Sequence, residues 1–310
     1  WSRLEPEPGR FDRDAFDRYR QILDAARAHG LAVLLTLNHF TLPRWVAERG
    51  GWTHASIPAV FERFADRAAR ELGDRVTLWA TLNEPSVLAW MGYAGDRWPP
   101  GRNTLPSAFV AIRRMLEAHA RARVAVRRVI PSAQVGIVVN MPYFVPADRG
   151  RRLDRLAAAL QDWAFSGCVV HALEHAELCF PLAWGRQPAP ELRESFDWLG
   201  LNYYGRYDVR FDLRAFGSAF GRHVQRPTVR TARTDWGQPC PHGMIRQLER
   251  LARLGAPLYV TENGTFDPDD SRRPGFLIDH VSALVDAVAG GLDVRGYFVW
   301  SLVDNFEWAE

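Results

Sequence analysis

The sequence predicts a single α/β domain built around a barrel of parallel strands. Short apolar runs with strand character alternate along the chain with longer runs of helical spacing, as in repeated β/α units. Polar residues follow the ends of the apolar runs, where the loops of a barrel build an active site. The alternative, a doubly wound sheet, needs a glycine-rich phosphate turn after its first strand, and no G-x-G-x-x-G or P-loop sequence is present.

Six strands are expected, each apolar on both faces until its last residues. They are Leu31–His39, Val76–Glu84, Val135–Asn140, Trp198–Tyr204, Leu258–Asn263 and Arg295–Ser301. Amphipathic helices are expected between them, such as one with Phe16 and Leu23 on its apolar face that ends at Gly30, and one with Met244 and Leu248 that ends at Gly255. No linker or repeat divides the chain, so we expect one domain over residues 1–310.

The charged residues exclude several classes of protein. All 39 basic residues are arginine, so mechanisms that need a lysine amine are excluded. A formal net charge of +3 is too small to indicate a nucleic-acid or membrane partner. The arginine-rich stretch Arg113–Arg128 has mixed helical spacing and is expected to be a solvated helix face.

The sequence indicates neither a metal nor a cofactor. Three cysteines, Cys168, Cys179 and Cys240, stand far apart without a C-x-x-C pair, and we interpret them as buried thiols. The nine histidines include no H-E-x-x-H pair. No run approaches the ~18 apolar residues of a membrane span. The lack of a disulfide pattern favours a cytoplasmic location.

Two carboxylates are set apart by their context. Glu84 ends the stretch WATLNE before Pro85, and Glu262 lies in YVTENG, each at the end of an apolar strand. Paired carboxylates suit glycosidic cleavage, because one protonates the leaving oxygen while the other attacks or stabilises the oxocarbenium-like centre. Twelve tryptophans could also supply flat apolar surfaces for sugar rings, although core packing explains them equally.

With both carboxylate motifs present, the sequence resembles glycoside hydrolase family 1 enzymes of the β-glucosidase type. The matching stretches, in the order of the family, are TLNHFTLP (36–43), GGW (50–52), GDR (73–75) leading into NEP (83–85), LGLNYY (199–204), TENG (261–264) and YFVWSLVDNFEW (297–308). They run from one end of the chain to the other.

The resemblance implies a retaining glycosidase on a (β/α)8 TIM barrel. Glu84 matches the general acid/base and Glu262 the nucleophile that forms a covalent glycosyl-enzyme. Glu84 should stay protonated while Glu262 is charged, because two like charges at one sugar are unfavourable. The resemblance also implies a non-proline cis peptide bond at Trp300-Ser301.

The remaining site residues implied by the resemblance contact the sugar or the nucleophile. Tyr204 matches a tyrosine that hydrogen-bonds the nucleophile, with Asn202 beside it, and Trp300 matches a stacking floor. Hydroxyl contacts are implied for Asn83 (the 2-hydroxyl), His39 and Trp308 (the far side of the ring) and Glu307 (the 4- and 6-hydroxyls). Glu307 and the lack of lysine favour neutral over 6-phosphorylated sugars.

The chain departs from the family at both ends. Trp1-Ser2-Arg3 resembles the end of the second strand of the family, so the barrel is expected to be incomplete, without its first strand, most of its second strand and its last helix. Exposed sheet edges and an open core favour aggregation. We therefore expect the chain as written to be poorly soluble or inactive, although the parent protein is an enzyme.

Three functions remain open. The first is a retaining β-glycosidase acting on terminal non-reducing β-D-glucosyl or related neutral residues of a small β-glycoside or oligosaccharide. The second is a non-catalytic sugar- or protein-binding relative, or an inactive fragment, on the same fold. The third is another barrel glycosidase or a transglycosylase. The sequence leaves open glucose against galactose or fucose, the aglycone and the oligomeric state.

Overall fold

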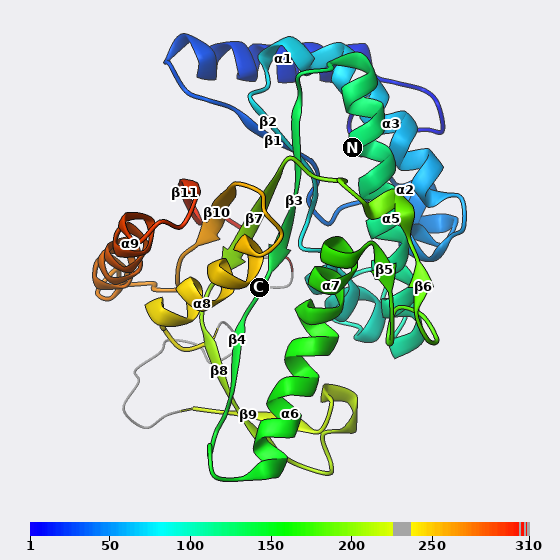
Figure 1. Ribbon diagram of the computed structural model, residues 1–310. Coiled ribbons are helices and arrows are strands. Elements are labelled where there is room, and N and C mark those ends of the chain that lie inside the picture. The colour runs from blue at the N-terminus through cyan, green and yellow to red at the C-terminus, as the bar shows by residue number, and fades with distance from the viewer. Residues whose placement is uncertain (226–236, 304, 307, 309–310) are drawn as a thin grey trace. The chain divides into compact units, whose positions relative to one another are not determined.

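The computed structural model describes residues 1–225, 237–303, 305–306 and 308. The chain divides into two compact units (Figure 1). Unit one comprises Trp1–Val138 and His175–Trp198, and unit two comprises Val139–Glu174 and Leu199–Glu310. The chain passes from one to the other within strand β3 (Gln134–Asn140). The expected single domain over residues 1–310 stays a prediction.

Unit one contains a parallel sheet in the order β1–β2–β3. Strand β1 spans Leu34–Asn38 and β2 spans Leu78–Asn83. Leu34 pairs with Leu78, and Leu78 in turn pairs with Gln134 of β3. Because the strands are parallel, their carboxyl ends meet at one edge of the sheet, which is where the polar residues lie. A two-stranded hairpin, β5 (Glu177–Leu178) and β6 (Gln187–Pro188), also belongs to this unit.

Helices connect and cover the strands of unit one. They are α1 (Arg13–Ala28), α2 (Arg44–Glu48), α3 (Ile57–Leu72), α4 (Pro85–Leu88) and α5 (Leu105–Val129), with the short turns η1 (Gly51–Thr53), η2 (Gly73–Arg75), η3 (Ala89–Ala94) and η5 (Pro190–Leu192). Helix α1 begins where the Asp12 side chain accepts a hydrogen bond from the Ala15 amide at 2.9 Å. Helix α5 begins in the same way at Thr104.

The core of unit one lies where α3 packs on α5. Phe61 and Phe64 of α3 and Ile112 of α5 are at most 1% exposed. The ring of Trp1 stacks on Phe64 with centroids 5.0 Å apart, so the first residue of the chain is part of this core. Full burial of each such side chain contributes about 1.5–3 kcal/mol to stability.

Unit two contains the parallel strands β7 (Trp198–Tyr203), β10 (Leu258–Asn263) and β11 (Val294–Val299), in that order. The segment after β3 joins β7, because the Met141 amide donates to the Asn202 carbonyl at 3.2 Å. A second sheet consists of β4 (Tyr143–Pro146), β8 (Arg206–Phe211) and β9 (Gly221–Val224).

The helices of unit two are α6 (Arg152–Asp162), α7 (Cys168–His175), α8 (Pro241–Ala252) and α9 (Arg273–Ala289), with the turns η4 (Trp163–Gly167) and η6 (Phe216–Ser218). Helix α8 packs on α9 and on β10. Met244 and Leu248 of α8 are fully buried, as the apolar spacing predicts.

The six expected strands are confirmed within the described residues, as are the two helices expected before Gly30 and Gly255. The six strands were expected to be apolar on both faces, which suggests burial on both faces, but β1 and β11 are only partly buried. Each lies at the edge of its unit's strand order, and Phe298 and Val299 of β11 are 39% and 47% exposed. Buried thiols were correct for Cys168, whereas Cys179 and Cys240 are partly exposed.

The strands of the second sheet and the hairpin were not expected from the sequence. Strand β4 is short, follows β3 after only two residues and ends in proline, so it shows no period of its own. Strand β4 pairs with β8, with Tyr143 opposite Arg206. These residues are far apart in the sequence, so no local pattern indicates the pairing.

One helical stretch is long and apolar enough on average to span a membrane, although it contains no unbroken run of ~18 apolar residues. Arg152–His175 has 24 residues, and 18 consecutive residues within it have a mean hydropathy of 1.2, so among the described residues it is long and apolar enough by length and composition alone. However, 56% of its apolar window is buried inside the protein. Ala157 and Ala158 pack with Val209 of β8, which is typical of a core helix.

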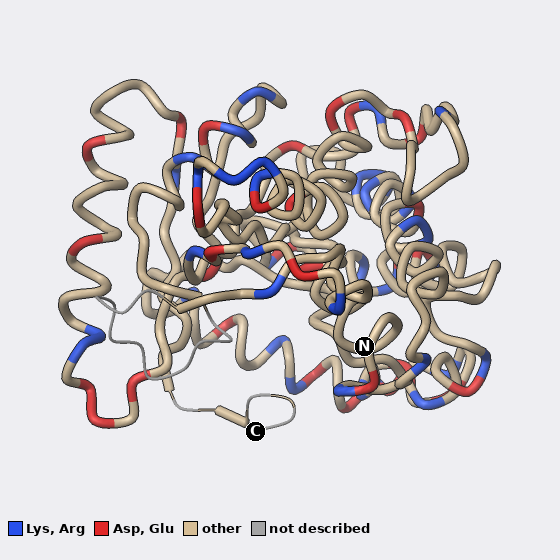
Figure 2. The backbone as a smooth tube through the Cα atoms, turned by 90° about the horizontal axis from the view of Figure 1, so that it is seen from below, with Lys and Arg blue, Asp and Glu red and all other residues tan. Residues whose placement is uncertain are grey.

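Arginines are paired with carboxylates on neighbouring positions, and Figure 2 shows basic and acidic positions side by side on several helices. In the stretch Arg113–Arg128, which forms most of α5, Arg114 bonds Glu117 at 2.9 Å. Arg128 bonds Asp66 of α3 at 3.1 Å and is 53% exposed. The expected solvated face of α5 therefore also forms an ion pair with α3.

Replacement of Gly136 in β3 by alanine should destabilise the chain. An added Cβ would lie 2.4 Å from the ring of Trp198 and 2.5 Å from its carbonyl oxygen. Such overpacking costs about 1–3 kcal/mol. Gly136→Ala should lower the urea midpoint of unfolding accordingly, whereas Gly217→Ala, which meets nothing within 4 Å, should leave it unchanged. Equal midpoints for the two variants would contradict the packing described here.

Candidate active site

Unit one places three predicted site residues at the carboxyl ends of β1 and β2. His39 directly follows β1, Asn83 is the last residue of β2, and Glu84 follows it. The Asn83 amide nitrogen lies 3.3 Å from Nε2 of His39, so these two side chains meet across the strands. Asn83 and Glu84 are each only 5% exposed. The Asn38 side chain instead donates to the Thr41 carbonyl at 2.8 Å and holds the turn after β1.

Glu84 is held in an uncommon backbone conformation. Its φ of 48° lies in the left-handed region, which costs energy for a residue with a Cβ and is frequent at functional sites. Its amide donates to the Val138 carbonyl of β3 at 2.9 Å. Pro85 follows as the first residue of α4, so the chain turns from strand to helix directly at the carboxylate.

Unit two places Glu262 near the end of β10, beside the end of β7. The Tyr204 hydroxyl donates to Oε2 of Glu262 at 2.5 Å, so the hydrogen bond expected between these residues is present. The Thr261 hydroxyl donates to Oδ1 of Asn202 at 2.6 Å. Asn202 is fully buried and Glu262 is 8% exposed. The polar side chains of Asn202, Tyr204 and Thr261 thus lie near one buried carboxylate, that of Glu262.

The last residue of β10, Asn263, is bonded both to β11 and to the residue that follows β11. The Trp300 amide donates to the Asn263 carbonyl at 3.0 Å, and the Tyr297 hydroxyl donates to Oδ1 of Asn263 at 2.6 Å. The predicted cis peptide bond at Trp300-Ser301 is confirmed. Trp308 is partly buried. Glu307 lies outside the described residues, so its predicted contact to the sugar stays a prediction.

Burial sets the charge state of His39. Its pKa is lowered by burial from 6.5 to about 4, so the ring is neutral at physiological pH. A neutral imidazole can both donate and accept a hydrogen bond, which suits a contact to a sugar hydroxyl. Burial likewise raises the pKa of Tyr297 to about 12, so its hydroxyl stays protonated.

No group of three or more histidine, cysteine or acidic side chains is placed to hold a metal ion within the described residues. The groups present at these strand ends are carboxylates, amides, a phenol and a neutral imidazole. This set can move protons, attack a carbon centre and hydrogen-bond hydroxyl groups.

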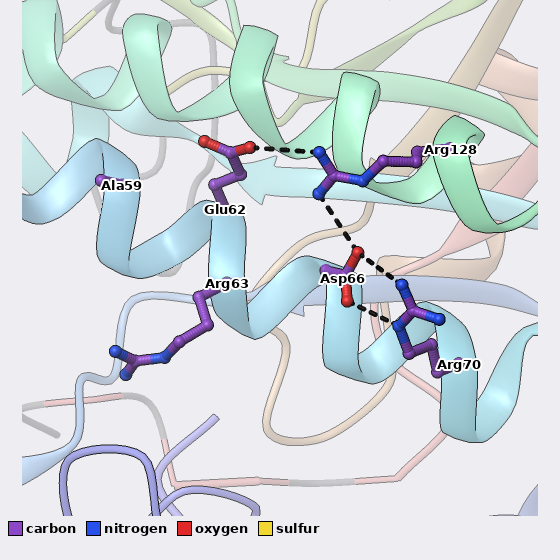
Figure 3. A pocket seen from close by; sticks show the side chains of 6 residues that line it. All are labelled: Ala59, Glu62, Arg63, Asp66, Arg70 and Arg128. Carbon is purple, nitrogen blue, oxygen red and sulfur yellow. Dashed lines mark hydrogen bonds and ion pairs between the residues drawn. The ribbon is translucent and has the colours of Figure 1, made fainter.

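An open hollow in unit one lies apart from these residues, between α3 and α5 (Figure 3). It is lined by Ala59, Glu62, Arg63, Asp66, Arg70 and Arg128. Asp66 bonds Arg70 at 2.7 Å and Arg128 at 3.1 Å, so these charges neutralise one another. Arg63 points away from the other side chains in Figure 3, and its guanidinium bonds the buried Glu5. We assign this hollow a structural role.

Two threonines next to the site were missed by the sequence analysis. Thr81 of β2 is fully buried and hydrogen-bonds His119, and Thr261 bonds Asn202. The available signal was a hydroxyl residue inside an otherwise apolar strand, shortly before each singled-out carboxylate.

The chain belongs to glycosyl hydrolase family 1, whose profile it matches over residues 1–310. Beta-glucosidase A of Thermotoga maritima is 32% identical over 333 residues, which cover 100% of this chain and 73% of that protein. A beta-galactosidase of Sulfolobus acidocaldarius is 31% identical, with 99% of this chain and 65% of that protein covered.

Solved structures agree with this assignment. A family 1 β-glucosidase from Thermotoga maritima superposes with a TM-score of 0.92 at 31% identity. The superposition covers 100% of this chain and 74% of that chain. A Thermotoga maritima family 1 enzyme complexed with a cyclophellitol analogue transition state mimic gives a TM-score of 0.91. The family, the (β/α)8 fold class and the class of O-glycosyl hydrolase expected from the sequence are confirmed. The chain spans about three quarters of the first of these relatives.

Acidification should destabilise the protein through its buried histidines. Burial lowers the pKa of His39 to about 4 and of His119 to about 3. Between pH 6.5 and 4 the unfolded chain binds protons that the folded chain does not, so the free energy of unfolding falls as the pH falls through this window. Each full proton contributes about 1.4 kcal/mol per pH unit.

Urea unfolding at pH 7, 6 and 5 measures this slope. His119→Gln should make the slope shallower, whereas His54→Gln, which changes an exposed histidine, should not alter it. The account would be wrong if wild type and His119→Gln lost stability in parallel.

Proposed function

We propose that this chain is a retaining β-glycosidase that removes terminal non-reducing β-D-glucosyl, or related neutral β-glycosyl, residues by double displacement. One observation carries the proposal: two carboxylates, Glu84 and Glu262, are buried at the carboxyl ends of parallel strands β2 and β10 in a family 1 chain. Two such carboxylates are what retaining cleavage requires.

In the first step Glu262 is the nucleophile. Its carboxylate attacks the anomeric carbon of the sugar, a carbon–oxygen ester bond forms, and the bond to the leaving oxygen breaks as Glu84 donates its proton to that oxygen. The Tyr204 hydroxyl donates to Oε2 of Glu262 at 2.5 Å, and this hydrogen bond helps to orient the attacking carboxylate.

In the second step water replaces the leaving group. The ester has neutralised Glu262, so Glu84, now a carboxylate, accepts a proton from water as the water oxygen attacks the anomeric carbon. The ester bond breaks, Glu262 regains its negative charge and Glu84 regains its proton. Two inversions at the same carbon leave the product with the configuration of the substrate.

Polar and aromatic residues around the carboxylates bind the sugar in this proposal. Asn83 holds the 2-hydroxyl, where a hydrogen bond strengthens in the transition state, and His39 contacts hydroxyls on the far side of the ring. Trp300 supplies the stacking floor. The remaining contacts are assigned to Asn202, beside the nucleophile, to Trp308, and to Glu307, which binds the 4- and 6-hydroxyls.

The substrate class is a neutral β-glycoside. The chain contains no lysine, and the carboxylate of Glu307 would repel a 6-phosphate dianion. The relatives include both a beta-glucosidase and a beta-galactosidase, so glucose and galactose are the two sugars to compare first. Transfer to a sugar acceptor uses the same covalent intermediate, and product analysis at high acceptor concentration separates it from hydrolysis.

A 2-fluoro β-glucoside with a good leaving group should label Glu262. The fluorine slows both steps because it destabilises their oxocarbenium-like transition states, and the good leaving group restores the rate of the first step alone, so the intermediate accumulates. Peptide mapping by mass spectrometry should find the sugar on the peptide that contains Glu262, and Glu262→Ala should remain unlabelled while Tyr204→Phe is labelled more slowly. A label on another residue would refute the assignment of the nucleophile.

A further inference from the structure

Each strand that carries a predicted catalytic carboxylate is irregular immediately before it. Along β2 and β3, Ala80 pairs with Gly136 and Asn83 with Val138, so Thr81 and Leu82 both lie opposite the single residue Ile137. This is a bulge, with one extra residue in β2. Bulges near active sites redirect the side chains that follow them.

Strand β10 repeats the arrangement. Val260 pairs with Leu201 and Glu262 with Asn202 of β7, so Thr261 is the extra residue. The pairing of β10 with β11 shifts over the same residues, because Val260 pairs with Tyr297 and Asn263 with Val299. In both strands a threonine therefore lies in the bulge, three residues before Glu84 in β2 and directly before Glu262 in β10.

The Thr81 hydroxyl ties its bulge to two neighbouring elements. It donates to the Gly136 carbonyl of β3 at 3.3 Å and lies 2.7 Å from Nδ1 of His119 in α5. A hydroxyl has only one proton. Because the Thr81 hydroxyl donates this proton to the Gly136 carbonyl, it accepts the shorter hydrogen bond from Nδ1 of His119. Thr81 and His119 are both fully buried, and burial keeps the imidazole neutral by lowering its pKa.

The Thr261 hydroxyl acts on the residue beside the predicted nucleophile. It donates to Oδ1 of Asn202 at 2.6 Å. Asn202 is fully buried, and it is paired in register with Glu262. This hydrogen bond therefore ties the bulged residue of β10 to the residue of β7 that is paired with Glu262.

Strand formation alone does not explain these hydroxyls. Valine has the same shape as threonine, favours strands as strongly and avoids the cost of burying a hydroxyl. Thr81 is fully buried and Thr261 partly buried, and a hydroxyl at such a bulge is useful when its hydrogen bonds select one geometry of that bulge.

We propose that Thr81 and Thr261 are positioning residues, whose hydroxyls hold the two bulges in the geometry that directs Glu84 to the leaving oxygen and Glu262 to the anomeric carbon. This inference rests on the proposed roles of the two carboxylates. Neither threonine contacts the reacting atoms in this scheme.

The test for Thr81 uses two substrates that differ in their need for an acid. Phenyl β-glucoside needs a proton on its leaving oxygen, whereas 2,4-dinitrophenyl β-glucoside does not. Thr81→Val should lower kcat/KM on the phenyl substrate by about tenfold or more and on the dinitrophenyl substrate by less than about twofold. The ratio of the two values, measured on one preparation, does not depend on the fraction of folded enzyme.

The test for Thr261 uses the nucleophile directly. Thr261→Val should lower the rate constant of inactivation by a 2-fluoro β-glucoside by about tenfold, because attack by Glu262 is misaligned. A rate constant of inactivation is also independent of the fraction of active enzyme. The loss in kcat/KM should be the same for both aryl glucosides, in contrast to Thr81→Val.

Matched variants control for the substitution itself. Thr81→Ser and Thr261→Ser keep the hydroxyl and should restore values close to wild type. Thr77→Val removes a hydroxyl at the other end of β2, where Thr77 accepts from the Val33 amide at 3.1 Å, and should leave the substrate ratio unchanged. Thr81→Ala is a second test if valine cannot be accommodated.

The outcomes are distinguishable. A wild-type protein that shows a cooperative urea unfolding transition, and is therefore folded, yet hydrolyses neither glucoside overturns the proposed function and this inference with it. If the wild type is active, the inference alone is overturned when kcat/KM of Thr81→Val or Thr81→Ala falls by the same factor on both substrates, or falls on neither. The same holds if Thr261→Val is inactivated within about twofold of the wild-type rate constant.

Discussion

Parallel strand pairing is the constraint on which the rest of this structure depends. In unit one it brings the carboxyl ends of β1 and β2 together, and in unit two those of β7 and β10. Side chains that are polar and far apart in the sequence meet at those ends, as His39 meets Asn83 and Tyr204 meets Glu262. The apolar bodies of the strands bury these groups, so each must find a partner in the protein or a substrate.

Burial and hydrogen bonding then determine which site residues are charged and which are neutral. A carboxylate that accepts from a phenol is stabilised as an anion, which suits a nucleophile. A neutral imidazole beside an amide adds hydrogen bonds without adding charge, which suits the recognition of a neutral sugar. Arginine side chains are found instead on helices such as α3 and α5, where they form ion pairs with carboxylates. The apolar strands bury the polar groups at their ends, whereas the charged residues of the helices form ion pairs near the surface.

The sequence predicted the strands and the residues at their ends because both are local patterns. An apolar run of strand length followed by NE or ENG is readable without a structure, and the family motifs assign roles to those residues. The bulges of β2 and β10, the left-handed backbone of Glu84 and the contact from Thr81 to His119 are not readable in this way. They depend on register and on which helix packs behind a strand, and neither is encoded over a few neighbouring residues.

The anomeric configuration of the first-formed product tests the central claim most directly. Hydrolysis of an aryl β-glucoside by the chain, followed by proton NMR within the first minutes, should show β-glucose before mutarotation produces the α anomer. This result requires two displacements at one carbon and hence a covalent intermediate. Appearance of α-glucose first would show a single displacement by water and would contradict the assignment of Glu262 as a nucleophile.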